Sequence, residues 1–185
     1  MEIGFIGTGV MGKPMVRCLL DAGYKVTVFD VRPESAEQLC QLGATWVSSP
    51  KEVGQVCDVL FTSLPGPAEV EEVMLSSTLG ALPYMRRGAV YIDTTTNSPT
   101  ISKKVAQACN KQRVVMLDAP VSGRPPSMTM MVGGELEDFV AYKKLLDCMG
   151  KNVFHVGPVG SGCAAKLVTQ YLEHLLNYQN LYLLK

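Results

Sequence analysis

The sequence lacks three features that would place it in a specialised class. It has no excess of either charge, because Lys and Arg together number 17 and Asp and Glu also number 17. A protein that binds nucleic acid through phosphate contacts needs an excess of basic residues, so we expect no nucleic-acid partner. A net charge of zero does not exclude a local basic patch on the surface. No uncharged apolar run approaches the roughly 20 residues that cross a bilayer. No basic and apolar leader precedes the first strand-like run, so we expect neither a membrane partner nor a secretory signal.

Paired cysteines and histidine clusters are lacking as well. The six cysteines lie far apart, form no Cys-x-x-Cys pair and share no Cys/His cluster. This pattern predicts free, buried thiols in a reducing compartment, the cytoplasm or the mitochondrial matrix, and no metal site. Of the two histidines, His155 lies in an apolar run and is expected to be structural, whereas His174 is expected to face solvent or a partner.

Apolar residues, by contrast, are plentiful. Hydrophobic residues make up 47% and charged residues 18% of the 185 residues, and the mean hydropathy is +0.15. A chain of this length and composition buries a substantial core, which excludes intrinsic disorder.

Strand-like and helical stretches alternate through the first two thirds of the chain. Strands that read as continuous apolar runs between helices are typical of a parallel sheet covered on both faces. Right-handed crossovers then give a doubly wound, mostly parallel α/β sheet of the Rossmann type. The strand-like runs are 3–6, 26–30, 45–47, 59–64, 89–92 and 114–117, and the helical stretches are 11–22, 34–42, 68–74 and 101–109.

The remaining third adds a strand at 128–132, a helix at 135–149 and a strand at 153–156. Residues 164–185 contain neither Gly nor Pro and predict one long helix. We therefore expect a dinucleotide-binding domain over 1–163 and the start of a long interdomain-type helix over 164–185. Because this helix is apolar on several sides, we expect it to be covered by a second copy in a homo-oligomer. Its apolar positions include Val168, Leu172, Leu175 and Leu176.

A Gly-x-Gly-x-x-Gly motif follows the first strand-like run and opens the first helical stretch. The first glycine permits a tight turn, the second lets the backbone approach a pyrophosphate, and the third lets the helix pack closely on the strand. The N–H groups and the dipole of the helix N-terminus then favour phosphate binding. We expect all six motif residues to bind a dinucleotide: Gly7, Thr8, Gly9, Val10, Met11 and Gly12.

Asp30 ends the second strand-like run, 18 residues after Gly12. A carboxylate there accepts hydrogen bonds from both ribose hydroxyls and repels a 2′-phosphate, which favours NAD over NADP. Arg32 points the other way, because a guanidinium could hold that phosphate. A plain turn at the strand end is the other interpretation of Asp30.

Two further strand ends are expected at the same crevice, because ligands bind outside the carboxyl ends of parallel strands. Leu64 and Pro65 follow the fourth strand-like run, and Thr94 to Thr96 follow the fifth. Loop stiffening by the prolines and a threonine helix cap before Pro99 are the competing interpretations.

Two later segments point to a particular chemistry. Residues 118–123 read Asp-Ala-Pro-Val-Ser-Gly and residues 160–166 read Gly-Ser-Gly-Cys-Ala-Ala-Lys. Together with the N-terminal glycine motif, they resemble the 3-hydroxyisobutyrate dehydrogenase family of β-hydroxyacid dehydrogenases, from residue 1 to about residue 166. The resemblance implies NAD(P)-dependent oxidation of a small β-hydroxy acid to a semialdehyde, or the reverse reduction.

The resemblance also implies residue roles. Lys166 would be the catalytic acid/base, and Ser122 and Gly123 would hold the substrate carboxylate. The implied cofactor contacts are Leu64, Pro65 and Thr96.

The residues fit this chemistry on physical grounds. Hydride transfer from an alcohol needs a group that takes the hydroxyl proton, and the positive end of a helix dipole disfavours the ammonium form of Lys166. A serine hydroxyl and neighbouring N–H groups bind a carboxylate without a formal charge. The glycines before Lys166 are expected to let the backbone approach the substrate.

The sequence departs from the family pattern in three places. Arg124 replaces a glycine, and the segment 124–131 is shorter than in the family. Thr169 and Gln170 replace two asparagines that help to orient the substrate, and Gln170 could still donate a hydrogen bond to it. The family's second, all-helical domain does not follow residue 185, which suggests a fragment or a diverged short form.

These departures leave a second hypothesis open, a truncated or inactive dinucleotide-binding module without catalysis. A 6-phosphogluconate-type decarboxylating enzyme ranks third, because no extra basic cluster is present to hold a sugar phosphate.

Overall fold

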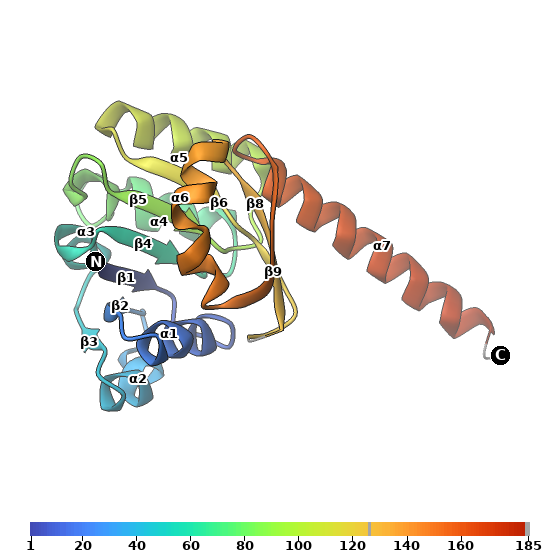
Figure 1. The fold of residues 1–185 in the computed structure, drawn as a ribbon, viewed down its shortest axis with the longest axis horizontal. Helices are drawn as coiled ribbons and strands as arrows, with labels where there is room; N and C mark the ends of the chain where they lie inside the picture. The colour runs from blue at the N-terminus through green and yellow to red at the C-terminus, as the bar shows by residue number, and fades with distance from the viewer. Residues whose placement is uncertain (126, 184–185) are drawn as a thin grey trace.

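The computed structural model describes residues 1–125 and 127–183, which form a twisted sheet flanked by helices and followed by one projecting helix (Figure 1). The described residues contribute nine strands to the sheet, in the order β3-β2-β1-β4-β5-β6-β8-β7, with β9 paired to β8. The strands are β1 (Glu2–Ile6), β2 (Lys25–Phe29), β3 (Thr45–Trp46), β4 (Val59–Thr62), β5 (Val90–Asp93), β6 (Val115–Asp118), β7 (Val121–Ser122), β8 (Met128–Gly133) and β9 (Gly150–Gly157).

The first six strands run parallel, in the spatial order of the doubly wound dinucleotide-binding fold. The strand β8 pairs antiparallel with β6 and β7 and parallel with β9. The expectation of a doubly wound, mostly parallel α/β sheet is therefore confirmed.

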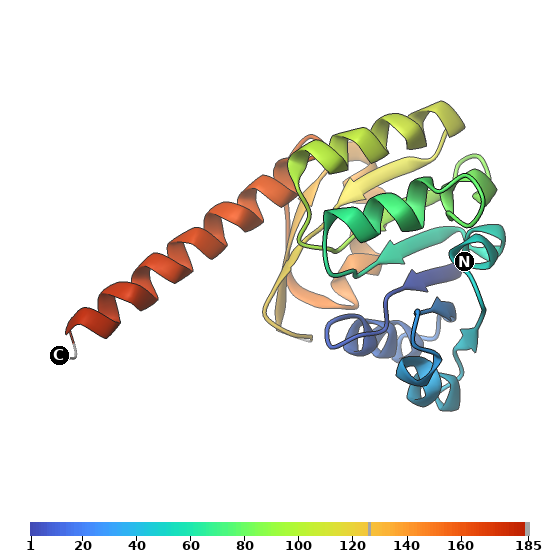
Figure 2. The same ribbon diagram turned by 180° about the vertical axis from the view of Figure 1, so that it is seen from behind.

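Helices cover both faces of the sheet, and each face has its own apolar cluster. On the face turned to the viewer in Figure 1, α1, α2 and α6 pack through residues such as Met15, Leu39 and Phe139. Figure 2 looks onto the other face, where α4 and α5 pack through Val70 and Val105. The helices are α1 (Gly12–Asp21), α2 (Glu37–Gln41), α3 (Pro50–Val56), α4 (Pro67–Leu75), α5 (Pro99–Gln112), α6 (Leu136–Asp147) and α7 (Ser161–Leu183).

The structure corrects several expected elements. The helix expected at 34–42 divides into a 3-10 turn, Pro33–Ala36, and the short α2. The helix α3 was not expected, although Ser49 accepts the Glu52 N–H at its start and so provides a local capping signal. The strand β7 was also missed, because two residues carry no periodic pattern and its pairing with β8 is not local.

The long helix α7 begins at Ser161, three residues before the expected start, and projects away from the sheet (Figures 1 and 2). The last two residues of the helix expected over 164–185 lie outside the described residues. Apolar side chains of its middle part are exposed, with Val168 59% and Leu176 61% exposed. None of the helices in the described part of the chain is both long and apolar enough to cross a membrane.

Candidate active site

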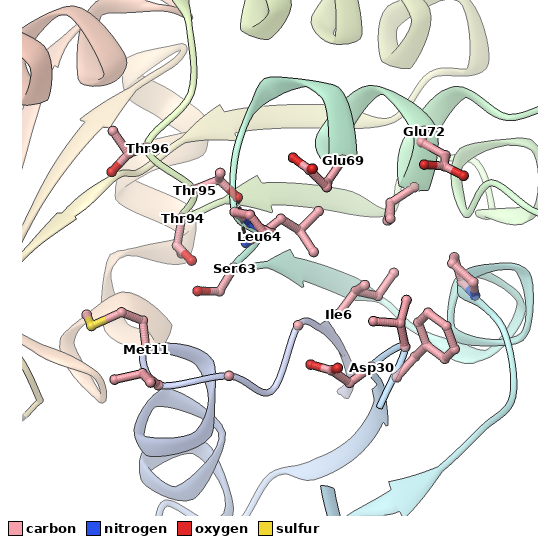
Figure 3. Close-up of a pocket in the computed structure, with 18 of the residues that line it drawn as sticks. Ile6, Met11, Asp30, Ser63, Leu64, Glu69, Glu72, Thr94, Thr95 and Thr96 are labelled. Carbon is pink, nitrogen blue, oxygen red and sulfur yellow. Dashed lines mark hydrogen bonds between the residues drawn. The ribbon is translucent and has the colours of Figure 1, made fainter. Parts of the chain in front are cut away.

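A cavity of about 790 Å³ opens where the carboxyl ends of the parallel strands meet the start of α7. Figure 3 shows Met11, Asp30, Leu64 and Thr94–Thr96 around it, from the loops that follow β1, β2, β4 and β5. The sequence-predicted residues that line this cavity are Gly7, Gly9, Val10, Met11, Asp30, Leu64, Pro65, Thr96, Gly123, Lys166 and Gln170.

The glycine motif forms the turn between β1 and α1. Gly7 has a φ of 95°, and a Cβ there would collide with the carbonyl oxygen of Ser63. A Cβ on Gly12 would collide with the carbonyl oxygen of Gly7, so α1 packs directly on the turn. At Gly9, by contrast, an added Cβ would meet nothing within 4 Å. The turn therefore requires two of the glycines for packing, and the third borders open space.

The helix α1 begins at this open space without a side-chain cap from the described residues. The Lys13 N–H donates to the Gly9 carbonyl at 3.0 Å and Pro14 has no N–H, but no described side chain caps this positive end of the helix dipole. Such an end is suited to a phosphate group. Open space at Gly9 and an uncapped helix start fit the pyrophosphate of a dinucleotide.

Asp30 links the glycine motif to the end of β2. Its Oδ2 accepts the Thr8 N–H at 2.7 Å, and its Oδ1 accepts the Arg32 N–H at 3.0 Å. The Thr8 hydroxyl lies 2.6 Å from the Ser35 hydroxyl. Asp30 thus holds two turns together, as the turn interpretation requires, and it also lines the cavity, as the ribose interpretation requires.

A second, smaller cavity of about 310 Å³ includes Thr8 and Arg32, whose N–H groups donate to Asp30. Lys13, Glu34 and Ser35 also line it, and Thr8 does not line the larger cavity. Two cations and two hydroxyls, with one carboxylate beside them, are suited to an anionic group.

The loops after β4 and β5 are tied to each other. The Leu64 N–H donates to the Thr95 hydroxyl at 3.0 Å, and the Thr94 hydroxyl donates to the Thr62 carbonyl at 2.6 Å. The cap of α5 is Ser98, whose hydroxyl accepts the Ile101 N–H at 3.1 Å. The threonines are therefore not the helix cap, and they border the cavity instead.

The Asp93 side chain holds the loop that carries Thr94–Thr96. It is fully buried at the end of β5 and accepts hydrogen bonds from the Thr62 hydroxyl, the Thr95 N–H and the Asn97 amide, at 2.8, 3.0 and 2.9 Å. Burial raises the pKa of Asp93, and the hydrogen bonds from Thr95, Asn97 and Thr62 oppose this rise. A buried carboxylate with three donors holds the loop in one conformation.

Lys166 lies two turns into α7, and its side chain is 6% exposed and lines the cavity. Gln170 follows one turn later on the same side and also lines the cavity. The helix therefore brings Lys166 and Gln170 to the same cavity that the glycine motif, more than 150 residues earlier in the chain, also lines.

Not every expected site residue reaches the larger cavity. Gly12 packs against Gly7, and Ser122 pairs with Thr129 in the β7–β8 hairpin, where it is half-buried between two cavity-lining neighbours, Val121 and Gly123. The expectation for the glycines before Lys166 finds no support in the cavity lining, because an added Cβ on Gly162 would meet the carbonyl oxygens of Met131 and Asp118.

The structure adds residues that the sequence interpretation missed. Glu69 and Glu72 of α4 border the cavity in Figure 3. The helix that follows β4 starts at the carboxyl edge of the sheet, and this topology could have identified it. Arg32, Thr94 and Thr95, which were already candidates from the sequence, also line the cavity. The other missed lining residues are Ile6, Phe29, Val31, Pro50, Ser63, Val73, Ser76, Leu79 and Val121.

His155 has the structural role that its sequence context suggested. Its Nε2 lies 2.7 Å from the Gly134 carbonyl oxygen, and its ring lies 5.3 Å from that of Phe139. Within the described residues, no group of three or more His, Cys, Asp or Glu side chains lies together as a metal ion would need.

Replacing Asp93 tests whether burial raises the pKa of its carboxyl group. A pKa raised in the folded state means that folded protein binds the proton more tightly than the unfolded chain, so wild-type stability falls as pH rises from about 4 through the folded-state pKa. Asp93→Asn removes this decline. We expect urea unfolding at several pH values to show that the stability of the variant relative to wild type improves as pH rises.

Thr62→Val is the matched control, because it keeps the carboxylate and removes one donor that lowers its pKa. The decline with pH should then extend to higher pH. A stability difference between Asp93→Asn and wild type that stays constant with pH would contradict this account.

Known proteins resemble the chain in both sequence and fold. Residues 2–157 match the family described as the NAD binding domain of 6-phosphogluconate dehydrogenase. The mitochondrial 3-hydroxyisobutyrate dehydrogenase of Bos taurus is 39% identical over 175 residues, which are 92% of this chain and 52% of that protein. The NAD-dependent L-serine dehydrogenase of Pseudomonas aeruginosa is 36% identical over 95% of this chain and 60% of its own length.

A solved structure of Mycobacterium tuberculosis 3-hydroxyisobutyrate dehydrogenase with L-serine superposes with a TM-score of 0.85 at 31% identity, over 91% of this chain and 58% of that one. The chain thus spans about half to three fifths of the relatives it matches. Sequence, fold and site agree that it carries an NAD-binding domain and belongs to the 3-hydroxyisobutyrate dehydrogenase family.

Proposed function

We propose that residues 1–163 bind NAD and that the chain takes part in hydride transfer between NAD and a small β-hydroxy acid or its semialdehyde. The observation that carries this proposal is that the glycine motif and Lys166 line one and the same cavity. The relatives named as 3-hydroxyisobutyrate dehydrogenase and NAD-dependent L-serine dehydrogenase support the substrate class.

The cofactor would occupy the cavity from the glycine motif to α7. The uncapped start of α1 and the open space at Gly9 would hold the pyrophosphate, and Asp30 would accept the ribose hydroxyls. Leu64, Pro65 and Thr96 would border its nicotinamide half. When bound, the nicotinamide ring supplies the hydride acceptor or donor.

The chain's own residues would supply the acid/base chemistry and the substrate contacts. Lys166 takes the hydroxyl proton when the alcohol is oxidised, and it returns the proton in the reverse reduction. The hydroxyl of Ser122 and the N–H of Gly123 hold the substrate carboxylate, and Gln170 donates a further hydrogen bond from the helix. The half-buried position of Ser122 beside the cavity supports this arrangement.

Lys166→Ala tests the catalytic role. Loss of a general acid/base lowers kcat by roughly a hundredfold to ten-thousandfold, while NAD affinity changes little. The measurement is the absorbance of NADH with a panel of β-hydroxy acids. Lys111→Ala is the control, because Lys111 lies in the last turn of α5, away from the cavity.

Two other outcomes would redirect the proposal. Turnover that survives Lys166→Ala would remove Lys166 from the reaction. NAD binding without turnover in the wild-type chain would favour the alternative, a dinucleotide-binding module without catalysis. Arg124, Thr169 and Gln170, which depart from the family pattern, favour that alternative.

The preference for NAD over NADP rests on Asp30 and is opposed by Lys13, Arg32 and Ser35 in the smaller cavity. Asp30→Ala removes charge-assisted hydrogen bonds to the ribose, so we expect NAD binding to weaken about tenfold or more in calorimetry. NADP binding should strengthen, because the charge that repels its 2′-phosphate is gone while Lys13 and Arg32 remain.

The control is Arg32→Ala, which should weaken NADP binding more than NAD binding. An unchanged cofactor preference in Asp30→Ala would exclude Asp30 from the ribose site.

We also propose that a second copy of the chain covers α7. The exposed Leu167, Val168, Leu172 and Leu175 support an apolar contact between copies. Sedimentation should show a dimer that Leu172→Glu dissociates, and a wild-type monomer at tens of micromolar would refute the contact.

The compartment is proposed to be reducing, either the cytoplasm or the mitochondrial matrix. All six cysteines are free, and burial raises the pKa of the Cys57, Cys109 and Cys163 thiols to about 12, so these three stay neutral. The relatives named as mitochondrial support the matrix.

A further inference from the structure

The carboxylate of Asp118 joins the end of β6 to the beginning of α7. It is fully buried, and it accepts the Gly160 N–H at 2.7 Å on Oδ1 and the Cys163 N–H at 2.8 Å on Oδ2. Gly160 directly precedes α7, and Cys163 lies in its first turn. Backbone N–H groups at this end of a helix have no partner within the helix, so Asp118 satisfies two of them.

Two glycines make room for this contact. A Cβ on Gly133, at the end of β8, would collide with Oδ1 of Asp118, and a Cβ on Gly162 would meet the carbonyl oxygens of Asp118 and Met131. The three segments 118–123, 128–134 and 160–166 therefore interlock at one carboxylate. Gly133 and Gly162 serve this close packing.

The side of α7 that faces α5 is held as well. The Cys163 thiol lies 3.3 Å from the Ser102 hydroxyl of α5. Residues 161–163 thus touch β6, β8 and α5, and the Thr169 hydroxyl, further along the helix, lies 3.9 Å from the Met131 sulfur of β8. The later part of the helix projects away from the sheet (Figure 1). The first turn therefore joins α7 to three other elements.

Lys166 lies three residues after Cys163, one turn above the bonds to Asp118. Its side chain is 6% exposed, so a small rotation of the first turn would move the amine out of the cavity. We propose that Asp118 is a positioning residue, whose carboxylate fixes the first turn of α7 and thereby sets where the Lys166 amine enters the cavity. This inference rests on the proposed catalytic role of Lys166.

The same carboxylate has an electrostatic consequence. From the sequence, the positive end of the α7 dipole is expected to act on Lys166. A negative charge on Asp118 at that end weakens the dipole effect. We therefore assign to Asp118 the placement of the amine, and not an enhancement of the dipole effect. A change at Asp118 should alter how accessible the amine is, before any cofactor or substrate is present.

The test is trace acylation of the Lys166 amine in the chain without cofactor, quantified by mass spectrometry. Asp118→Asn keeps one acceptor, and Asp118→Ala keeps none. Losing a helix cap shifts local opening by roughly tenfold, so labelling of Lys166 should rise by about that factor in the alanine variant and by less in the asparagine variant. Labelling of Lys13 and Lys111 in the same samples should stay constant.

Asp58→Ala is the matched control. Asp58 accepts the Glu2 N–H at 2.8 Å and precedes β4, at the amino ends of the strands, whereas Asp118 lies at the carboxyl end of β6. Its loss lowers global stability without touching α7, so labelling of Lys166 should not change. Equal labelling of Lys166 in wild type and both Asp118 variants, or the same rise in Asp58→Ala, would overturn the proposal.

A second measurement needs no variant and applies even if the Asp118 variants do not fold. The Gly160 and Cys163 amides of the wild-type chain should exchange their hydrogens at least tenfold more slowly than unprotected amides; free exchange of both would also overturn the proposal. Calorimetry with NAD reports on the proposed function separately. A chain that shows the labelling changes but binds no NAD would refute the function and retain the placement of Lys166 by Asp118.

Discussion

Buried carboxylates at the carboxyl ends of three strands hold the loops that form the cavity. Asp30 accepts the Thr8 N–H after β2, Asp93 accepts the Thr95 N–H at the end of β5, and Asp118 accepts the Gly160 and Cys163 N–H groups at the end of β6. Each bond joins a rigid strand to a loop or to the start of a helix. Since the loops have little regular structure of their own, the geometry of the cavity depends on these bonds.

The sheet could be predicted well from the sequence, because its parallel strands are buried on both faces and read as apolar runs between helices. The glycine motif could be placed because it stands between a strand-like run and a helical stretch. Gly12 packs on Gly7 within the motif, whereas the contact of Gly7 with Ser63 in the loop after β4 is not local. The missed elements, which include α3, β7 and the 3-10 turn Leu82–Tyr84, are short, and β7 exists only through its pairing with β8.

The cavity was harder to predict than the fold. Lys166 was identified through a resemblance, since periodicity alone describes it as an ordinary helical lysine. Glu69 and Glu72 reach the cavity because α4 starts at the edge where the strands end, a relation that depends on strand order. Gly133 and Gly162 leave room for Asp118 only because three segments that are distant in sequence meet at this point. The sequence of any one of these segments could not have predicted the contact.

The central claim is that a dinucleotide lies on the glycine motif and extends toward α7. An NMR titration of the labelled chain with NAD tests it most directly, because each backbone amide reports its own surroundings. The account predicts saturable shifts at Gly9, Val10 and Met11, together with shifts near Thr96 and Lys166. Shifts confined to other parts of the chain, or none at millimolar NAD, would contradict it.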